Sequence, residues 1–559
     1  MTESPTVFPE DEIHPSPSET EQEATNARVA GATGIIALGN IASRILGLTR
    51  EKTLAYFFGA SAQLDAFRIA VLVPQTFYDL LIGGHVNGAI VPVLSEIVTL
   101  EGRDELWKVV NVLVTMLLLV VSALVVVLEI FAPQIVGLID AQNPALATDL
   151  LRITAPALIF LALFAIFSGT LYALKSFTYP AFAGVMFNAS IVIAIFVLVP
   201  SSELIFIQEQ SFLPFHIMLP TNAVTAAAIG WFIGAVVQML IQMPGLDLSK
   251  LKFSFNWRHP ALRNVVVLYA PVMASLLMDT LVIRFFSYRL ASQTDIVGSI
   301  SYMNQATTLI QFPQGLVATA ISIAILPTLA SQASSILKEG VQAFRNTLGL
   351  GIRLATTLII PATLGLLILA VPIVRLLFEG GEFTPADTEI TVLALRLYLF
   401  GLPFAAIDLL LVYAFYARKD TLTPALIGLF SHVVYIVTVL LLFSRFGLFS
   451  LMIADSIKHM VHAVISGVLL HRRIDGFAEQ NFIGTTLKTL VSALAMGIVG
   501  WITLTWLTDA IGTVGAINQI LLVLIPGLLS GSVFLICAYL LKIDELRWLI
   551  GLVKKRLIS

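Results

Sequence analysis

The sequence has 559 residues, of which 58% are hydrophobic and only 12% are charged. A soluble domain carries about 25% charged residues, so a water-soluble protein of this composition would expose large apolar patches. The formal net charge of −3 argues against nucleic acid as a partner. The single cysteine, Cys537, excludes a disulfide framework within the chain and a CxxC metal site. We therefore expect an all-α integral membrane protein.

The first 28 residues differ in composition from the rest of the chain. They are rich in Glu, Ser, Pro and Thr and contain few large apolar residues, which is typical of disorder. They also lack the basic and apolar regions of a cleavable signal peptide. We predict a disordered, acidic cytoplasmic tail over residues 1–28 that the protein retains.

Apolar segments long enough to cross a bilayer, about 20 residues each, fill the remaining sequence. About fourteen can be distinguished, over residues 31–58, 66–97, 107–138, 148–173, 179–199, 217–244, 264–291, 297–331, 346–378, 389–417, 422–443, 448–470, 484–508 and 514–541. Lys and Arg occur in alternate loops, as with Arg103, Lys108, Lys250 and Lys252, and Arg445 is the clear exception. Because positive residues stay in the cytoplasm, we predict that both termini are cytoplasmic.

Two parts of the sequence repeat each other. The motifs LR, YALK and PA at residues 151–152, 172–175 and 180–181 recur as LR, YARK and PA, 244 positions later. AIVPVL at 89–94 likewise recurs as AILPTL at 324–329. We predict two pseudo-symmetric six-helix lobes in parallel orientation, over 29–245 and 246–474, followed by two extra helices and a basic cytoplasmic tail over 475–559. Transporters with such repeats bind substrate between the lobes, although two similar bundles without a transport role would give the same pattern.

Ionisable residues within membrane segments are costly, and they usually face a cavity or a partner. The first segment carries Arg44 and Arg50, the second opens with Asp65 and Arg68 as an i,i+3 pair, and the seventh carries Arg284. Arginine binds phosphate oxygens in a bidentate manner and keeps its charge. These five residues are therefore the candidate substrate-binding residues, for a diphosphate-bearing substrate. The alternative for Arg44 and Arg50 is an interfacial position without a ligand.

Further acids and histidines lie in the second half of the sequence. Asp279, Asp408 and Asp455 could partner the arginines or bind a coupling cation, and the residues alone do not separate these options. His459 and His462 are i,i+3 neighbours that we expect at the membrane interface rather than on a metal. The sequence contains no Walker A, HExxH or GxSxG motif. We therefore predict that the protein does not drive transport with ATP through its own P-loop, that it is not an enzyme, and that it needs no cofactor.

Three motifs lie close together in the first two apolar segments: SRILGLTRE at residues 43–51, FFGA at 57–60 and LDAF at 64–67. Together they resemble the amino-terminal signature of the MurJ (MviN) family. Further similar motifs are IVPVL at 90–94, LIQFP at 309–313, LFEGGEFT at 377–384 and FYARKDT at 415–421. The resemblance runs from about residue 31 to the end, and the order and spacing of the motifs are more specific than any single motif.

The resemblance implies a lipid II flippase of the MOP (multidrug/oligosaccharidyl-lipid/polysaccharide) superfamily in the bacterial plasma membrane. It implies fourteen helices, a cationic cavity between two lobes, and a groove for the polyprenyl tail on the last two helices. Lipid II would move outward by alternating access, driven by a coupling ion or by the membrane potential. Arg44, Arg50 and Asp65 occupy positions that are functional in the family.

Three positions depart from the family pattern. Tyr78 and Thr308 stand where the family usually has arginines, and Gly83 stands where it has a glutamate. We hypothesise that Arg68 and Arg284 rebuild the diphosphate site at another height or fit a different glycan. The alternatives are a flippase for another polyprenyl-linked glycan, a cation-coupled exporter of the same superfamily, and a non-transporting scaffold for envelope synthesis.

Overall fold

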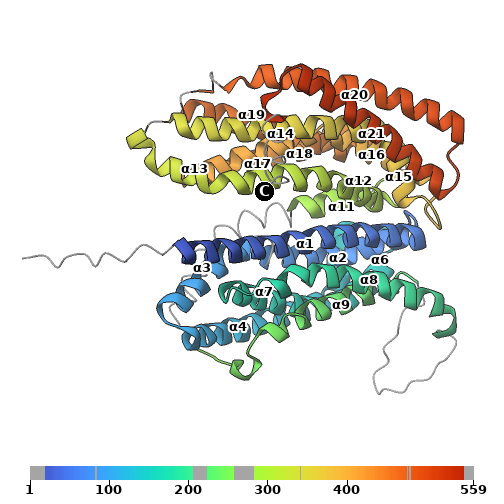
Figure 1. Cartoon of the computed structure of the whole chain (residues 1–559). Coiled ribbons are helices and arrows are strands. Elements are labelled where there is room, and N and C mark those ends of the chain that lie inside the picture. The colour runs from blue at the N-terminus through green and yellow to red at the C-terminus, as the bar shows by residue number, and fades with distance from the viewer. Residues whose placement is uncertain are drawn as a thin grey trace, which may run out of the picture.

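The computed structural model describes residues 19–81, 85–205, 223–256, 282–339, 341–474, 476–477 and 480–546. Apart from one isolated bridge between Gly380 and Phe383, the regular elements in these ranges are helices. The predicted all-α membrane fold is confirmed. Figure 1 shows two groups of helices side by side: α1 to α9, here called the first half, and α11 to α21, the second half.

The helices of the first half are α1 (Glu19–Phe58), α2 (Ala62–Leu81), α3 (His85–Leu100), α4 (Arg103–Ile130), α5 (Ala132–Ile139), α6 (Pro144–Thr154), α7 (Ala157–Ala173), α8 (Thr178–Ile205) and α9 (Thr225–Leu240). The helices of the second half are α11 (Arg284–Ser292), α12 (Ser299–Pro313), α13 (Ala320–Glu339), α14 (Gln342–Ile368), α15 (Ala370–Phe378), α16 (Pro385–Leu399), α17 (Leu402–Ala417), α18 (Leu422–Phe446), α19 (Phe449–Arg473), α20 (Phe482–Ile511) and α21 (Ala516–Leu540). A π-helical turn, Gln314–Thr319, joins α12 to α13.

Ten described helical segments are long and apolar enough to span a membrane, or eleven when the bent pair α16–α17 counts as one span. These eleven spans coincide with eleven of the fourteen segments predicted from the sequence. The other three predicted segments are 31–58, 66–97 and 264–291, and most of the last falls on residues 257–281, outside the described ranges. The total of fourteen therefore stays a prediction.

Helix α1 begins at Glu19, twelve residues before the first predicted membrane segment. The added turns contain Glu, Gln and Ala, which favour the helical conformation even without apolar character. Hydropathy therefore locates the apolar part of this helix and not its start. Of the predicted disordered tail, residues 1–18 lie outside the described part of the chain.

The repeated motifs have matching backbone conformations. Lys175 after α7 and Lys419 after α17 both adopt left-handed conformations, with φ of 62° and 59°. In both turns, the N–H of the following residue bonds to the carbonyl five positions earlier, at 2.8 and 3.0 Å, which is the Schellman pattern. Each of these helices also follows a short helix, α6 or α16, across a two-residue break. Local structure thus recurs at the spacing of the sequence repeat.

Small residues position α1 in the first half. A Cβ added to Gly39 would lie 2.3 Å from the carbonyl oxygen of Ala181 on α8. A Cβ added to Gly230 on α9 would lie 2.9 Å from Cα of Ile191 on α8. Small residues let helices pack closely in membranes, where the hydrophobic effect does not drive association. This packing holds α1 against α8 while another side of α1 faces the second half (Figure 1).

The turn between α17 and α18 depends on Asp420. Its carboxylate accepts hydrogen bonds from Thr423, at 3.0 Å from the backbone N–H and 2.7 Å from the hydroxyl, and from the guanidinium of Arg473 on α19. Burial raises the pKa of Asp420, but these hydrogen bonds outweigh it and hold the pKa below its usual value of 3.8. The carboxylate therefore contributes stability above pH 3.8 that is lost as the pH falls further.

We expect Asp420→Asn to destabilise the protein by at most about 1 kcal/mol at pH 7, because asparagine can still cap Thr423 but loses the charge that binds the exposed guanidinium of Arg473. The thermal unfolding midpoint of the variant should be lower than that of the wild type at pH 7, and the two should converge below pH 3.8. A difference that stays constant across this range would contradict the role given to the ionised carboxylate.

Candidate functional site

Glu51 on α1 lies between two guanidinium groups. Its Oε1 accepts hydrogen bonds from Arg50 Nη2 at 2.8 Å and from Arg68 Nη1, on α2, at 3.2 Å. Its Oε2 accepts a further hydrogen bond from Arg68 Nη2. The side chains of Glu51 and Arg68 are only 3% and 8% exposed, whereas that of Arg50 is 24% exposed. One carboxylate and two guanidinium groups together carry a net positive charge. Arg50 is the member of this group that a ligand can reach most easily.

Glu51→Gln is expected to lower the free energy of unfolding by about 3 kcal/mol or more, because it leaves Arg68 buried without its counter-charge. Glu105→Gln is the matched control, since Glu105 pairs with Lys108, whose side chain is 70% exposed, and such pairs contribute about 0–1 kcal/mol. Thermal unfolding of both variants in detergent checks this difference. Equal effects of the two substitutions would contradict it.

Asp65 does not form the expected pair with Arg68 but binds the second half of the protein. Its carboxylate accepts hydrogen bonds from Ser301, at 2.8 Å from N and 2.6 Å from Oγ, and from the N–H of Ile300 at 3.2 Å. These groups form the first turn of α12, where free N–H groups and the helix dipole favour an anion. Sequence spacing could not predict this contact, because Asp65 and Ile300 are 235 residues apart in the chain.

Arg44 and Arg50 point in different directions from α1, because six residues at 100° each separate their side chains by about 120°. Arg44 reaches the second half, where its Nη1 donates to the carbonyl of Gln311 at 3.2 Å. Its guanidinium lies against Gly315 in the π-helical turn. Arg50 stays within the first half and donates to Oδ1 of Asn188 on α8 at 3.0 Å. The two arginines thus flank the boundary between the halves.

Further hydrogen bonds join the halves near the end of α1 and at the end of α5. They run from Lys52 Nζ to the carbonyl of Leu376 at 2.9 Å, from the N–H of Glu382 to the carbonyl of Tyr56 at 2.9 Å, from Arg289 Nη1 to the carbonyl of Leu138 at 3.3 Å, and from Gln293 Nε2 to Oδ2 of Asp140 at 3.1 Å. With the contacts of Asp65, they define a region that we call the junction.

Three glycines with positive φ permit the close approach at the junction. A Cβ on Gly298 would lie 2.2 Å from the carbonyl oxygen of Ala60, and one on Gly381 would lie 2.1 Å from that of Tyr56. Gly59 approaches the second half in the same way. Only glycine combines a left-handed backbone with such closeness to another chain segment. At this end, the halves are closed against each other.

Arg284 lies at the start of α11 and is half-buried. One turn later, Tyr288 accepts a hydrogen bond from Nδ2 of Asn304 on α12 at 2.9 Å, and Thr308 donates to the carbonyl of Asn304 at 2.8 Å. Arg284 therefore lies one turn from a polar group that links α11 to α12. Gly83, Asp279 and the side chain of Tyr78 lie outside what the structure describes.

A second group of ionisable residues lies within the second half. Asp408 on α17 shares a hydrogen bond with His462 on α19. Asp455 accepts from Lys458 Nζ at 2.7 Å and lies 3.8 Å from Nε2 of His459. These aspartates therefore contact a lysine and two histidines. Among the residues that the structure describes, no three Asp, Glu, His or Cys side chains form a metal site.

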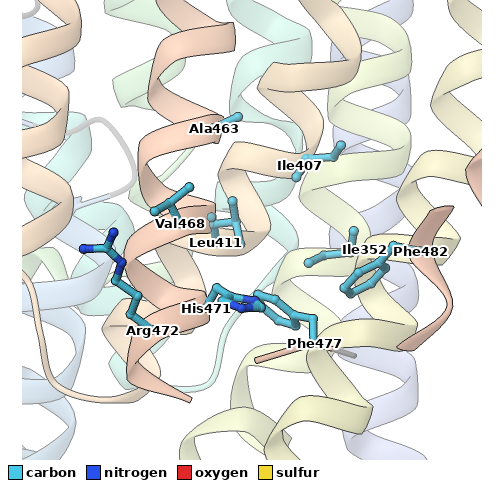
Figure 2. A pocket seen from close by; sticks show the side chains of 10 residues that line it. Ile352, Ile407, Leu411, Ala463, Val468, His471, Arg472, Phe477 and Phe482 are labelled. Atoms are coloured by element: carbon cyan, nitrogen blue, oxygen red, sulfur yellow. The ribbon is translucent and has the colours of Figure 1, made fainter. Parts of the chain in front are cut away.

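The lining of an apolar pocket of about 360 Å³ (Figure 2) includes Ile407 and Ala463, the sequence neighbours of Asp408 and His462. The pocket is lined mainly by aliphatic and aromatic side chains of α14, α17, α19 and the start of α20, with His471 and Arg472 as its basic members. None of the five predicted substrate-binding residues lines it. The pocket is therefore separate from the arginines at the boundary of the halves.

Comparison with known proteins decides the family. Residues 54–522 match a family model described as the lipid II flippase MurJ. The chain belongs to the MurJ family. The probable lipid II flippase MurJ of Vibrio cholerae is 31% identical over 499 residues, covering 86% of this chain and 89% of that protein. The lipid II flippase MurJ of Burkholderia cenocepacia is 30% identical over 404 residues, with coverages of 69% and 73%.

Solved structures give the same assignment. A structure of the lipid II flippase MurJ in an inward closed conformation superposes with a TM-score of 0.70 and 25% identity, covering 89% of this chain and 98% of that one. An inward-facing multidrug resistance transporter of the MATE family and MOP superfamily gives a TM-score of 0.59 at 16% identity, with coverages of 78% and 96%. The second likeness shows the fold alone. The chain is a multi-pass membrane transporter, as family membership predicts, and not an enzyme.

Proposed function

We propose that the protein moves lipid II, the polyprenyl-diphosphate-linked precursor of peptidoglycan, from the inner to the outer leaflet of the bacterial plasma membrane. Membership of the MurJ family supports this function. The structural observation that carries it is the net positive group of Arg50, Arg68 and Glu51, next to Arg44, at the boundary of the halves. A diphosphate supplies the matching negative charge.

We further propose fourteen membrane helices in two pseudo-symmetric lobes, over 29–245 and 246–474, with two added helices over 475–559 and both termini in the cytoplasm. The recurring turns at Lys175 and Lys419 support the repeat. With this orientation, α1 starts at the cytoplasmic side of the membrane and ends at the periplasmic side. The junction lies at the end of α1 and therefore faces the periplasm. The described conformation is then closed outward.

In the proposed site, Arg44 and Arg50 bind the diphosphate. Arg44 donates to a neutral carbonyl, that of Gln311, and a phosphate oxygen is a stronger acceptor. Binding would therefore withdraw Arg44 from α12 and remove one contact between the halves. Arg68 is held by Glu51 and positions it, while Arg284 is a further candidate for the same ligand.

Transport then requires the junction to open. Each neutral hydrogen bond across it contributes about 1 kcal/mol, and those of the Asp65 carboxylate contribute more. A membrane potential supplies about 2.3 kcal/mol per charge per 100 mV, which is enough to bias such an equilibrium when a few charges move. The polyprenyl tail stays in the membrane, and we place it along α20 and α21.

Complementation tests this function. In bacteria depleted of their own lipid II flippase, the chain should restore growth, and an Arg44→Ala/Arg50→Ala variant expressed at the same level should not. Rescue by both would contradict the role of the arginines. Failure of the wild type, when folded in the membrane, would contradict lipid II transport.

A second candidate is a flippase for another polyprenyl-linked glycan. Tyr78 and Thr308 favour it, because the family usually has arginines at these positions. Transport of such a glycan without rescue of lipid II transport would support this candidate. A cation-coupled exporter would tolerate loss of both arginines, and a scaffold would retain its function without moving lipid.

A further inference from the structure

A buried group of polar side chains fastens the last two helices to α14. Arg353 on α14 donates from Nε to Oε1 of Glu545, shortly after the end of α21, at 2.5 Å. Its Nη1 donates to the backbone carbonyl of Gln480, just before α20, at 2.8 Å and to Oε1 of the same residue at 3.1 Å. Nε2 of Gln480 in turn donates to Oδ1 of Asn346 on α14 at 2.7 Å. We call these four residues the clamp.

The clamp is largely buried, and space is made for it on α14. The side chains of Arg353 and Glu545 are 20% and 6% exposed, and Gln480 is 4% exposed. A buried charge needs both a counter-charge and hydrogen bonds, and Glu545 and Gln480 supply them to the guanidinium. Gly349 lies on the same face of α14 as Asn346 and Arg353, at spacings of three and four residues. A Cβ there would lie 2.1 Å from Oε1 of Gln480, so the glycine makes the space that Gln480 fills.

The clamp is the charged end of an otherwise apolar contact. The same face of α14 continues with Ile360 and Leu364, which pack against a cluster of buried side chains from α20, α21 and the residues after α21: Ala493, Met496, Phe534, Ala538, Ile543 and Leu546. Figure 1 shows α20 and α21 next to α14. The hydroxyls of Ser492 and Ser530 donate within their own helices. Because apolar contact gives helices little reason to associate in lipid, the hydrogen bonds of the clamp supply a specific attachment.

Both ends of the helix pair meet at the clamp, since Gln480 precedes α20 and Glu545 follows α21. One guanidinium therefore fixes the start of α20 and the end of α21 against the same helix. At the opposite end, Val514 in the turn between the two helices is 85% exposed. A Cβ added to Gly512 or Gly515 in this turn would meet nothing within 4 Å. The spacing of α20 and α21 and their tilt against α14 thus depend on the clamped end.

We propose that Arg353 is a positioning residue for the polyprenyl tail, and that the clamp makes transport selective for long tails. The inference rests on the proposed function, which places the tail along α20 and α21. A tail that moves from lipid to protein exchanges one apolar environment for another, so its affinity depends on close contact with the two helices. A long tail makes more of these contacts than a short one and depends more on the spacing of the helices. The diphosphate, which Arg44 and Arg50 bind, does not depend on this spacing.

Vesicles containing the purified full-length protein test this proposal with labelled lipid II that carries either its natural polyprenyl tail or a farnesyl tail. The wild type should have the lower KM for the natural tail. In the Arg353→Met/Glu545→Leu variant, apolar side chains replace the ion pair and leave no unpaired charge. Loss of one hydrogen bond to a charged group corresponds to about a tenfold change in an equilibrium. The KM for the natural tail should therefore rise about tenfold or more, whereas the KM for the farnesyl lipid and both kcat values should stay those of the wild type.

Two single variants give milder tests. Gln480→Met removes the side-chain bonds to Arg353 and Asn346 but leaves the ion pair with Glu545. It should raise the KM for the natural tail by less than the double variant does, and it decides the question if the double variant does not fold. Arg353→Lys keeps the charge beside Glu545 but not the planar guanidinium, so it should keep most of the preference for the natural tail.

Asp420→Asn is the matched control. It removes an ion pair with Arg473 within the second half that involves neither α20 nor α21. The ratio of its two KM values should equal that of the wild type.

The outcomes separate the two claims. A wild-type ratio of the KM values in the double variant and in Gln480→Met would overturn the role of the clamp. So would an equal loss of transport with both lipids, because the clamp would then support the fold rather than the tail. A wild type that transports both lipids with the same KM would overturn the selectivity. A wild type that moves neither lipid would instead overturn the proposed function.

Discussion

Asp65→Ala is expected to abolish transport by opening the junction between the halves. The substitution removes three hydrogen bonds to one buried carboxylate and leaves the N–H groups of Ile300 and Ser301 without an acceptor. Hydrogen bonds to a charged group contribute about 1.5–3 kcal/mol each, so the closed state should lose at least about 3 kcal/mol. That is more than a hundredfold in its population.

Rescue of flippase-depleted bacteria checks this expectation, together with a distance measurement across the junction between labels on Leu138→Cys and Asp295→Cys in a Cys537→Ser background. Gln293→Ala is the matched control. It removes a single exposed hydrogen bond at the same junction and should preserve both transport and the distance. Full rescue by Asp65→Ala at normal expression would show that the contact with α12 is dispensable.

Gly298→Ala should have a comparable effect by preventing the junction from closing. Its Cβ would lie 2.2 Å from the carbonyl oxygen of Ala60, and a backbone oxygen cannot give way without moving α1 and α2. The glycine also has a φ of 81°, which costs other residues about 1–2 kcal/mol. We expect a lengthened distance across the junction and a loss of rescue of at least tenfold.

Gly102→Ala separates the clash from the backbone strain. Gly102 also has a positive φ, of 91°, but nothing lies within 4 Å of its added Cβ. It should cost about 1–3 kcal/mol of stability while transport and the junction distance stay those of the wild type. Equal losses of transport in the two variants would mean that strain, and not closure, explains the effect of Gly298→Ala.

The class of fold was predictable because it depends on amino-acid composition, on the length of the apolar segments and on the repeat in the sequence. Apolar segments of bilayer length predict membrane helices, and the repeated YALK and YARK motifs end helices in the same type of turn. Helix α1 shows the limit of this approach. Its first twelve residues are helical without being apolar, so hydropathy places its beginning too late.

The charged residues at the boundary of the halves were predictable in residue type, but their pairing was not. Arg44, Arg50, Asp65 and Arg68 were singled out by their charge within apolar segments. Spacing suggested that Asp65 meets Arg68, whereas Arg68 binds Glu51 and Asp65 binds α12. Contacts between helices far apart in sequence leave no periodic signal.

The glycines of the junction were missed for a related reason. Gly298 and Gly381 lie in loops, where glycine is common, and only the position of the opposite backbone shows why a side chain cannot be present. The signal that could have identified Gly381 is its place in the LFEGGEFT motif. The Asp408–His462 contact was equally hidden, since its partners are 54 residues apart.

Movement of labelled lipid II between the leaflets of vesicles containing only the purified protein tests the central claim most directly. Under an applied membrane potential, the wild type should move the label well above the rate of protein-free vesicles, and Arg44→Ala/Arg50→Ala should slow it at least tenfold. A wild type no faster than protein-free vesicles, or a double variant as fast as the wild type, would contradict the account.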